Sequence, residues 1–170
     1  MTKTGIFYGP IGGNTEKVAK KIHEYLPEAG FHSVPESGVS EMLKYDNLIL
    51  GIATIGQETW SQDVRKSGWN TILPQLKETD FTGKTIALFG LGDSVAYDLH
   101  FVDAMGILAK LMREKGGTLI GFTETKGYTF RESQAIENEK FMGLPIDEDF
   151  EEDKTDERIA QWINEIKNKM

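Results

Sequence analysis

The chain has 170 residues and a formal net charge of −8, with 27 acidic and 19 basic side chains and no cysteine. The lack of cysteine excludes disulfides, thiolate metal sites and cysteine nucleophiles, and the acidity argues against nucleic acid or an anionic membrane surface as a partner. No apolar stretch approaches the roughly 20 residues of a membrane-spanning helix and no signal peptide is evident, so we expect a cytoplasmic protein.

Apolar strand-like runs alternate with amphipathic helical patterns along the chain. We predict strands at about Lys3–Tyr8, Phe31–Val34, Asn47–Ala53, Lys84–Gly90 and Thr118–Phe122. We predict helices near Thr15–Leu26, Ser40–Leu43, Trp69–Leu76, Phe101–Lys115 and Thr155–Lys169. The runs at 48–53 and 85–89 are continuously apolar, which is typical of parallel strands covered on both faces. The pattern predicts a single doubly wound α/β domain over residues 1–170, with a five-stranded parallel sheet in the order 2-1-3-4-5.

The segment from Thr123 to Asp149 interrupts this alternation. It is polar, carries aromatic residues and has no clear helical pattern. Because it exceeds the usual length of a connection, we interpret it as a structured insertion with a function of its own.

The first predicted strand ends in a glycine-rich loop, Gly9-Pro10-Ile11-Gly12-Gly13-Asn14-Thr15, just before a helix. Glycines let backbone N–H groups turn inward, and a helix start adds free donors and a partial positive charge. The loop lacks both the Walker A lysine and the dinucleotide fingerprint, so it suits a monophosphate held without a charged side chain. The alternative is an ordinary glycine-rich turn, capped by Asn14 or Thr15.

Two further loops are expected at the same edge of the sheet. They are Thr54-Ile55-Gly56-Gln57-Glu58-Thr59-Trp60 and Gly90-Leu91-Gly92-Asp93-Ser94-Val95-Ala96-Tyr97. Ligands of open α/β sheets bind at the carboxyl ends of the strands, where these loops begin. A glycine in one loop and an aromatic residue in the other suit a flat ring, although each is also common in plain turns.

Two longer motifs carry a resemblance to a known family. The first is Phe89-Gly90-Leu91-Gly92-Asp93, followed by Tyr97 and Phe101-Val102-Asp103-Ala104-Met105-Gly106; the second runs from Gly127-Tyr128 to Asp149. Over essentially its whole length the chain resembles the flavodoxin family, and the second motif resembles the extra loop of its long-chain subgroup. The resemblance implies that this loop interrupts the last strand, which we expect to resume around Phe141–Leu144.

The resemblance also implies a non-covalent FMN and a role for each loop. Asn14, Thr15 and the amides of the first loop would hold the phosphate, Tyr97 would stack on the ring, and Gly92 and Asp93 would contact its pyrimidine edge. The peptide between Gly56 and Gln57 would face flavin N5. The full predicted cofactor-binding set is Gly9, Pro10, Ile11, Gly12, Gly13, Asn14, Thr15, Thr54, Ile55, Gly56, Gln57, Leu91, Gly92, Asp93, Tyr97 and His100. No catalytic residue and no metal site are predicted.

The sequence departs from the family pattern at two places. Pro10 and Gly12 stand where the family usually has hydroxyl residues, which predicts weaker phosphate binding. Ile55 stands where many members have a tryptophan on the inner flavin face, so either Ile55 or Trp60 covers that face. His100 is either a pH-sensitive neighbour of the ring or solvated surface.

These features predict an electron carrier rather than an enzyme. We expect a monomer that passes electrons between a flavodoxin/ferredoxin reductase and electron-accepting oxidoreductases, and an acidic cluster of Asp63, Asp93, Asp98 and Asp147 that lowers the flavin potential. The runs 147–149 and 151–153 are interpreted as solvated acidic loops, or else as part of an acidic rim that docks basic patches of a partner, and the insertion as an element of partner recognition. An FMN-dependent NAD(P)H:quinone reductase and a scaffold with weakened FMN binding remain alternatives; a phosphorylated receiver module is disfavoured because the acids it needs are missing after the first and third strands.

Overall fold

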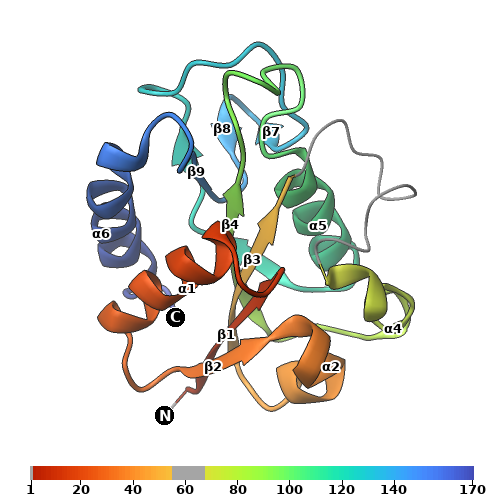
Figure 1. The fold of residues 1–170 in the computed structure, drawn as a ribbon. Coiled ribbons are helices and arrows are strands. Elements are labelled where there is room, and N and C mark those ends of the chain that lie inside the picture. Colours follow the sequence, from red (N-terminus) through yellow and green to blue (C-terminus); the bar gives the residue numbers. More distant parts are fainter. Residues whose placement is uncertain (1, 55–67) are drawn as a thin grey trace.

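The main sheet of the computed structural model is parallel, and its strands run in the order β2-β1-β3-β4-β5 (Figure 1). The structure describes residues 2–54 and 68–170. The strands are β1 (Thr4–Gly9), β2 (Gly30–Ser33), β3 (Asn47–Ala53), β4 (Thr85–Leu91), β5 (Thr118–Ile120) and β9 (Leu144–Ile146). Both β5 and β9 pair with β4, β5 near its start and β9 near its end. The predicted fold class, strand order and interrupted last strand are therefore confirmed.

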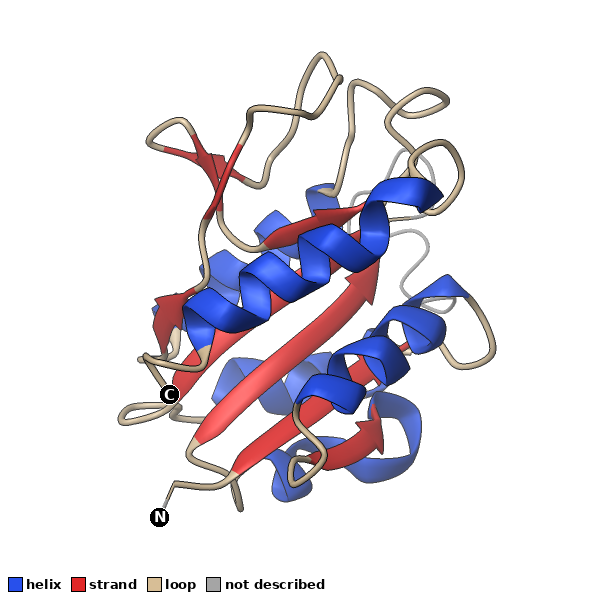
Figure 2. Cartoon of the chain, turned by 90° about the vertical axis from the view of Figure 1, so that its left-hand side faces the viewer, coloured by secondary structure: helices blue, strands red, loops and turns tan. Residues whose placement is uncertain are grey.

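Helices cover both faces of this sheet. On one face lie α1 (Asn14–Tyr25) and α6 (Thr155–Ile166), which stand in front of the strands in Figure 2. On the other lie α2 (Val34–Met42), α4 (Leu73–Glu78) and α5 (Asp103–Glu114). Two short 3-10 turns, η1 (Trp69–Thr71) and η2 (Glu152–Lys154), precede α4 and α6. In the described part of the chain no helix is long and apolar enough to cross a membrane.

Alternate residues of the central strands build two cores. In β3, Leu48, Leu50 and Ile52 pack toward α2 and α5, whereas Ile49 packs toward α1 and α6. This division follows from the two-residue period of a strand, and it explains why the strand sequences are apolar throughout. Gly51 interrupts the run because the ring of Phe89 on β4 lies across it.

The insertion folds into a small antiparallel sheet of its own. It contains β6 (Thr123–Glu124), β7 (Ile136–Glu137) and β8 (Lys140–Phe141), in the order β6-β8-β7. The prediction that the main strand resumes around Phe141–Leu144 is therefore wrong at its start, because Phe141 belongs to β8 and the parallel strand begins at Leu144. Between them Gly143 passes so close to β4 that a Cβ there would lie 2.4 Å from the Leu88 carbonyl oxygen.

Two helix predictions also differ from the structure. The second helix starts at Val34 rather than near Ser40, because Pro35 suits the first turn of a helix and Gly38, at a φ of +71°, kinks the segment without ending it. The predicted helix at Trp69–Leu76 is divided into η1 and α4, and Pro74 stands in the first turn of α4.

Candidate functional site

The carboxyl ends of β1, β3 and β4 meet at one edge of the sheet. Gly9 lies beside Ile52, and Ala53 lies beside Leu91. The loops that follow these strands therefore begin next to one another, at the edge where open α/β sheets bind ligands. The predicted residues Ile55, Gly56 and Gln57, together with Trp60 and Asp63, lie outside the described residues.

The loop after β1 turns directly into α1. Its Gly9–Pro10 peptide is cis, and Gly12 has a φ of +82°, a conformation that glycine adopts without steric cost. Gly13 precedes the helix, and no side chain caps the helix N-terminus. The alternative of a turn capped by Asn14 or Thr15 is therefore wrong, and the first amides of α1 face outward without an acceptor in the helix.

Polar side chains at the start of α1 are also free to bind. Thr15 is 1% exposed, yet its hydroxyl makes no hydrogen bond within residues 2–54 and 68–170. The side-chain amide of Asn14 is likewise without a hydrogen bond to any described residue, and it is exposed. The loop and the start of α1 thus offer backbone amides, one hydroxyl and one carboxamide as donors. This set suits an anion of the size of a phosphate monoester.

A hydrogen bond beneath this loop has no signal in the sequence. The Tyr8 hydroxyl donates to Glu16 Oε1 at 2.7 Å, and so ties the end of β1 to the first turn of α1. The pKa of Glu16 is lower than its ordinary value, mainly because of this hydrogen bond. Burial is the main cause that raises the pKa of Tyr8 above its ordinary value, and the bond to Glu16 adds to it. The pair therefore stays hydrogen-bonded over the neutral pH range.

Thr54, at the start of the loop after β3, supports a neighbouring helix. Its hydroxyl accepts a hydrogen bond from the backbone N–H of Ala104 at 2.9 Å, and its own N–H donates to the Leu91 carbonyl at 2.9 Å. Ala104 is the second residue of α5, so Thr54 satisfies one of the free amides at that helix start. The side chain thereby fixes the end of β3 against α5.

The loop after β4 forms a tight turn that presents Tyr97. Asp93 Oδ1 accepts hydrogen bonds from the backbone N–H groups of Val95 at 3.0 Å and Ala96 at 2.7 Å, and the Asp93 carbonyl accepts from Tyr97 at 3.1 Å. Tyr97 is 43% exposed. At the base of the turn, a Cβ on Gly92 would come within 3.0 Å of Val102 Cγ1. The turn is therefore held by Asp93, and it carries Tyr97 as a partly exposed residue.

His100 is more than a solvated surface residue. Its Nδ1 lies 3.1 Å from Oδ2 of Asp103, which is 1% exposed. Asp103 also accepts hydrogen bonds from the backbone N–H of Gln134 at 2.7 Å and from its side chain at 3.2 Å. The buried carboxylate connects His100, α5 and the insertion, a role that the sequence alone does not indicate.

The insertion packs against the loop that carries Tyr97. The backbone N–H groups of Arg131 and Glu132 donate to the Asp98 carbonyl at 2.8 and 2.9 Å, and the Arg131 side chain pairs with the Asp98 carboxylate. Chiefly through its hydrogen bond, Arg131 lowers the pKa of Asp98. Asp98 is therefore not a free negative charge, and the insertion braces the loop after β4.

In the acidic run 147–149, which its composition predicts to be a solvated loop, only Asp149 is exposed. Asp147 is 0% exposed and Glu148 is 8% exposed. Asp147 accepts four hydrogen bonds, from Ser94, Asp149 and Phe150. Of the four acids expected to lower the flavin potential, Asp98 is paired with Arg131, whereas Asp93 and Asp147 accept hydrogen bonds from neutral donors only among the described residues.

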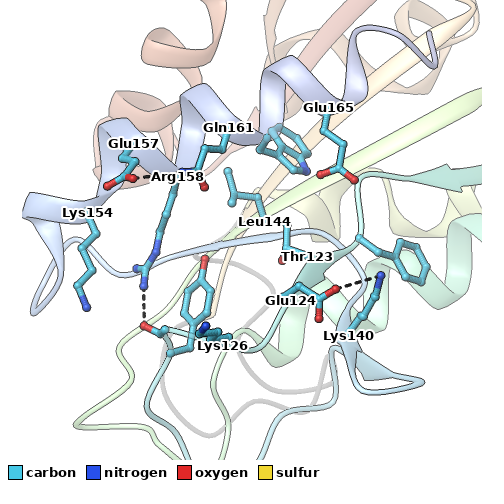
Figure 3. A pocket seen from close by; sticks show the side chains of 14 residues that line it. Thr123, Glu124, Lys126, Lys140, Leu144, Lys154, Glu157, Arg158, Gln161 and Glu165 are labelled. Atoms are coloured by element: carbon cyan, nitrogen blue, oxygen red, sulfur yellow. Dashed lines mark hydrogen bonds and ion pairs between the residues drawn. The ribbon is translucent and has the colours of Figure 1, made fainter.

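A separate cavity of about 550 Å³ lies between the insertion and α6 (Figure 3). At its wall the Arg158 guanidinium stands 3.9 Å from the centre of the Tyr128 ring and donates to the Gly127 carbonyl at 3.0 Å. Burial is the main cause that raises the pKa of Tyr128. Side chains of both signs line the cavity, and most of its cations are paired with nearby carboxylates, so it does not resemble a site for a single charged ligand.

Comparison with known proteins places the chain among redox proteins of one family. Residues 6–162 match the family model described as flavodoxin. The chain is 42% identical over 170 residues to the flavodoxin of Synechocystis, covering 98% of this chain and 97% of that one, and 42% identical over 169 residues to flavodoxin 1 of Azotobacter vinelandii, covering 96% and 94%.

A solved flavodoxin structure also matches this chain over its full length. The Fusobacterium nucleatum flavodoxin bound to flavin mononucleotide superimposes with a TM-score of 0.87 at 35% identity, covering 100% of this chain and 99% of that one. The fold of the described residues agrees with these matches, and the chain belongs to the flavodoxin family.

Proposed function

We propose that this chain carries electrons between redox proteins through one FMN, bound without a covalent link at the carboxyl edge of the sheet. The observation that carries the proposal is the uncapped start of α1 together with the partly exposed Tyr97, on loops that leave β1 and β4 at the same edge of the sheet. The F. nucleatum flavodoxin, which matches over the full chain, is bound to FMN. FMN supplies the electron chemistry, and the protein binds it and tunes it.

The phosphate is proposed to bind at the loop after β1. The amides of residues 11–15, the Thr15 hydroxyl and the Asn14 carboxamide supply neutral donors, and the N-terminus of α1 adds its partial positive charge. Pro10 supplies no amide, and neither Pro10 nor Gly12 supplies a hydroxyl. We therefore expect a binding site that depends on Thr15 more strongly than one with several hydroxyl side chains.

The ring is proposed to lie against the loops after β3 and β4. The partly exposed Tyr97 is proposed to stack on the ring, and the backbone at Gly92, which packs closely on Val102, is proposed to face the edge of the ring. The proposal includes Thr54, Leu91, Asp93 and His100 from the described residues, and Ile55, Gly56 and Gln57 from the segment outside them. Asp93 acts through its turn, because one oxygen of its carboxylate already accepts two amides.

Partner proteins are proposed to dock around the ring. Ile11 is 48% exposed, Val95 61% and Leu99 40%, all on the two loops that flank the ring. With the net charge of −8, this apolar centre suits a partner whose surface is apolar at its middle and basic around it, such as a flavodoxin/ferredoxin reductase or an electron-accepting oxidoreductase. The proposed state is a cytoplasmic monomer with transient contacts, and the absence of cysteine suits a reducing compartment.

A relay assay tests the function. The FMN-loaded protein is added to NADPH, a ferredoxin-type reductase and cytochrome c, and we expect cytochrome c reduction to rise in proportion to it. Without the reductase, we expect no NADPH oxidation, even with a quinone present. NADPH oxidation by the isolated protein would instead support the quinone-reductase alternative, and failure to stimulate the relay would contradict the proposal.

A further inference from the structure

The two consecutive acids that follow β9 contact both halves of the proposed FMN site. Asp147 contacts the loop after β4, which carries Tyr97, and Glu148 contacts α1, whose start forms the loop for the phosphate. Asp147 directly follows β9 and Glu148 begins the turn after it, so this short stretch reaches both. This inference rests on the proposed function and concerns the division of labour within that site.

Asp147 holds the loop after β4 through hydrogen bonds to Ser94. Its Oδ2 accepts hydrogen bonds from the Ser94 backbone N–H at 3.1 Å and the Ser94 hydroxyl at 2.5 Å. Its Oδ1 accepts from the backbone N–H groups of Asp149 at 3.0 Å and Phe150 at 2.9 Å. One residue earlier, the Ile146 carbonyl accepts from the Gly92 N–H at 3.0 Å. A buried carboxylate is stable only with such donors, so the position of Ser94 is strongly constrained.

Glu148 fastens α1 in a different way. Its Oε2 accepts a hydrogen bond from the Thr155 hydroxyl at the start of α6, at 3.0 Å. Its Oε1 is buried, receives no hydrogen bond within the described residues, and has the Lys17 ammonium 3.4 Å away as its counter-charge. Lys17 stands one turn after Asn14, and its N–H donates to the Gly13 carbonyl at 3.1 Å. A shift of the first turn of α1 would leave a buried carboxylate without its cation, which is costly.

We propose that Asp147 and Glu148 are positioning residues that set the two halves of the FMN site separately. Asp147 holds the ring-side loop through Ser94, and Glu148 holds the phosphate-side helix through Lys17. Neither acid touches the cofactor. The ring is common to FMN and riboflavin, whereas the phosphate belongs to FMN alone, so the two contributions separate when both ligands are measured.

The test titrates the full-length apoprotein with FMN and with riboflavin and follows the quenching of flavin fluorescence. For the ring side, D147N is expected to weaken both ligands about tenfold, and S94A to weaken both about threefold, which leaves the ratio of the two dissociation constants unchanged. D153N is the matched control, because it removes the same charge from an exposed residue nearby. It is expected to change neither dissociation constant by more than about twofold.

For the phosphate side, the substitution at Glu148 keeps the negative charge and shortens the side chain by one methylene group. E148D is expected to weaken FMN about fivefold and riboflavin less than twofold, because only the phosphate depends on α1. E157D is its control, since Glu157 is exposed on α6 and the same shortening there moves neither α1 nor the loops. Should E148D fail to fold, as judged by near-UV circular dichroism, T155V removes the hydroxyl donor to Glu148 without a charge change and is expected to act in the same direction with a smaller effect.

The outcomes separate the inference from the function. If E148D or T155V weakens riboflavin as much as FMN, or if both D147N and S94A leave the two affinities unchanged, the division of labour is wrong. If D147N does not fold, S94A alone decides the ring side. A wild-type protein that binds neither flavin would instead contradict the proposed function, whatever the variants do.

Discussion

Arg131 in the insertion holds Asp98, which directly follows Tyr97. Its Nε lies 2.5 Å from Asp98 Oδ2 and its Nη2 lies 3.1 Å from Oδ1, while its backbone N–H donates to the Asp98 carbonyl at 2.8 Å. Backbone and side chain act on the same residue, so the insertion fixes one end of the turn that presents the Tyr97 ring. In this chain the insertion therefore has a structural role, in addition to any role in partner recognition.

R131Q is therefore expected to loosen the turn and weaken FMN binding about two- to fivefold, the range of a single exposed charged contact. R113Q is the matched control, because Arg113 makes a comparable two-point pair with Glu137 but stands on α5 away from Tyr97. Fluorescence titration measures both variants. Equal affinities for R131Q and R113Q would show that the ion pair does not support the site.

A second prediction concerns the core beneath the site. In G51A the new Cβ on β3 would lie 2.1 Å from Cζ of Phe89 on the neighbouring strand β4, at the centre of the sheet. Because overpacking a core commonly destabilises by about 1–3 kcal/mol, we expect a loss of that size in the free energy of unfolding by urea. G13A is expected to lose far less, because a Cβ there meets nothing within 4 Å. Adding F89L to G51A is expected to recover part of the loss, and no recovery would contradict the packing argument.

The sequence predicts the sheet well and the polar contacts poorly. Continuous apolar runs and strand–helix alternation are enough to place β1, β3 and β4 and their order, because hydrophobic periodicity reflects burial directly. The sequence predicts that the acids at 147 and 148 are solvated, since charge runs usually are. Their burial depends on hydrogen bonds from Ser94 to Asp147 and on the positive charge of Lys17 beside Glu148, and both partners lie far away in the chain. The spacing of residues along the sequence does not indicate such long-range pairs.

A third prediction concerns the proton on Glu16. In Y8F the hydroxyl that donates to Glu16 Oε1 is absent, so the pKa of Glu16 is expected to rise toward that of an ordinary glutamate. A folded-state pKa below the unfolded value stabilises the fold above the unfolded pKa, and this contribution is lost as the pH falls through the folded pKa. Y8F is therefore expected to lose part of the pH dependence of stability in the acid range. Carboxyl-carbon NMR titration measures the shift directly, and an unchanged Glu16 pKa would contradict the assignment.

A fourth prediction concerns Thr54. T54V removes the acceptor for the Ala104 N–H and leaves a buried amide at the start of α5 without a partner, so we expect about 1–2 kcal/mol lower stability. T54S keeps the hydroxyl and is expected to keep most of the stability. Urea unfolding of the apoprotein compares the two. A T54V variant as stable as T54S would mean that water replaces the hydroxyl at no cost.

The most direct test of the site as a whole is the titration of wild-type apoprotein with FMN. Donors at the start of α1 and the partly exposed Tyr97 predict complete quenching of flavin fluorescence at one FMN per chain, with T15A binding about tenfold more weakly than wild type. Flavin fluorescence that stays unquenched in the presence of excess protein would contradict the account.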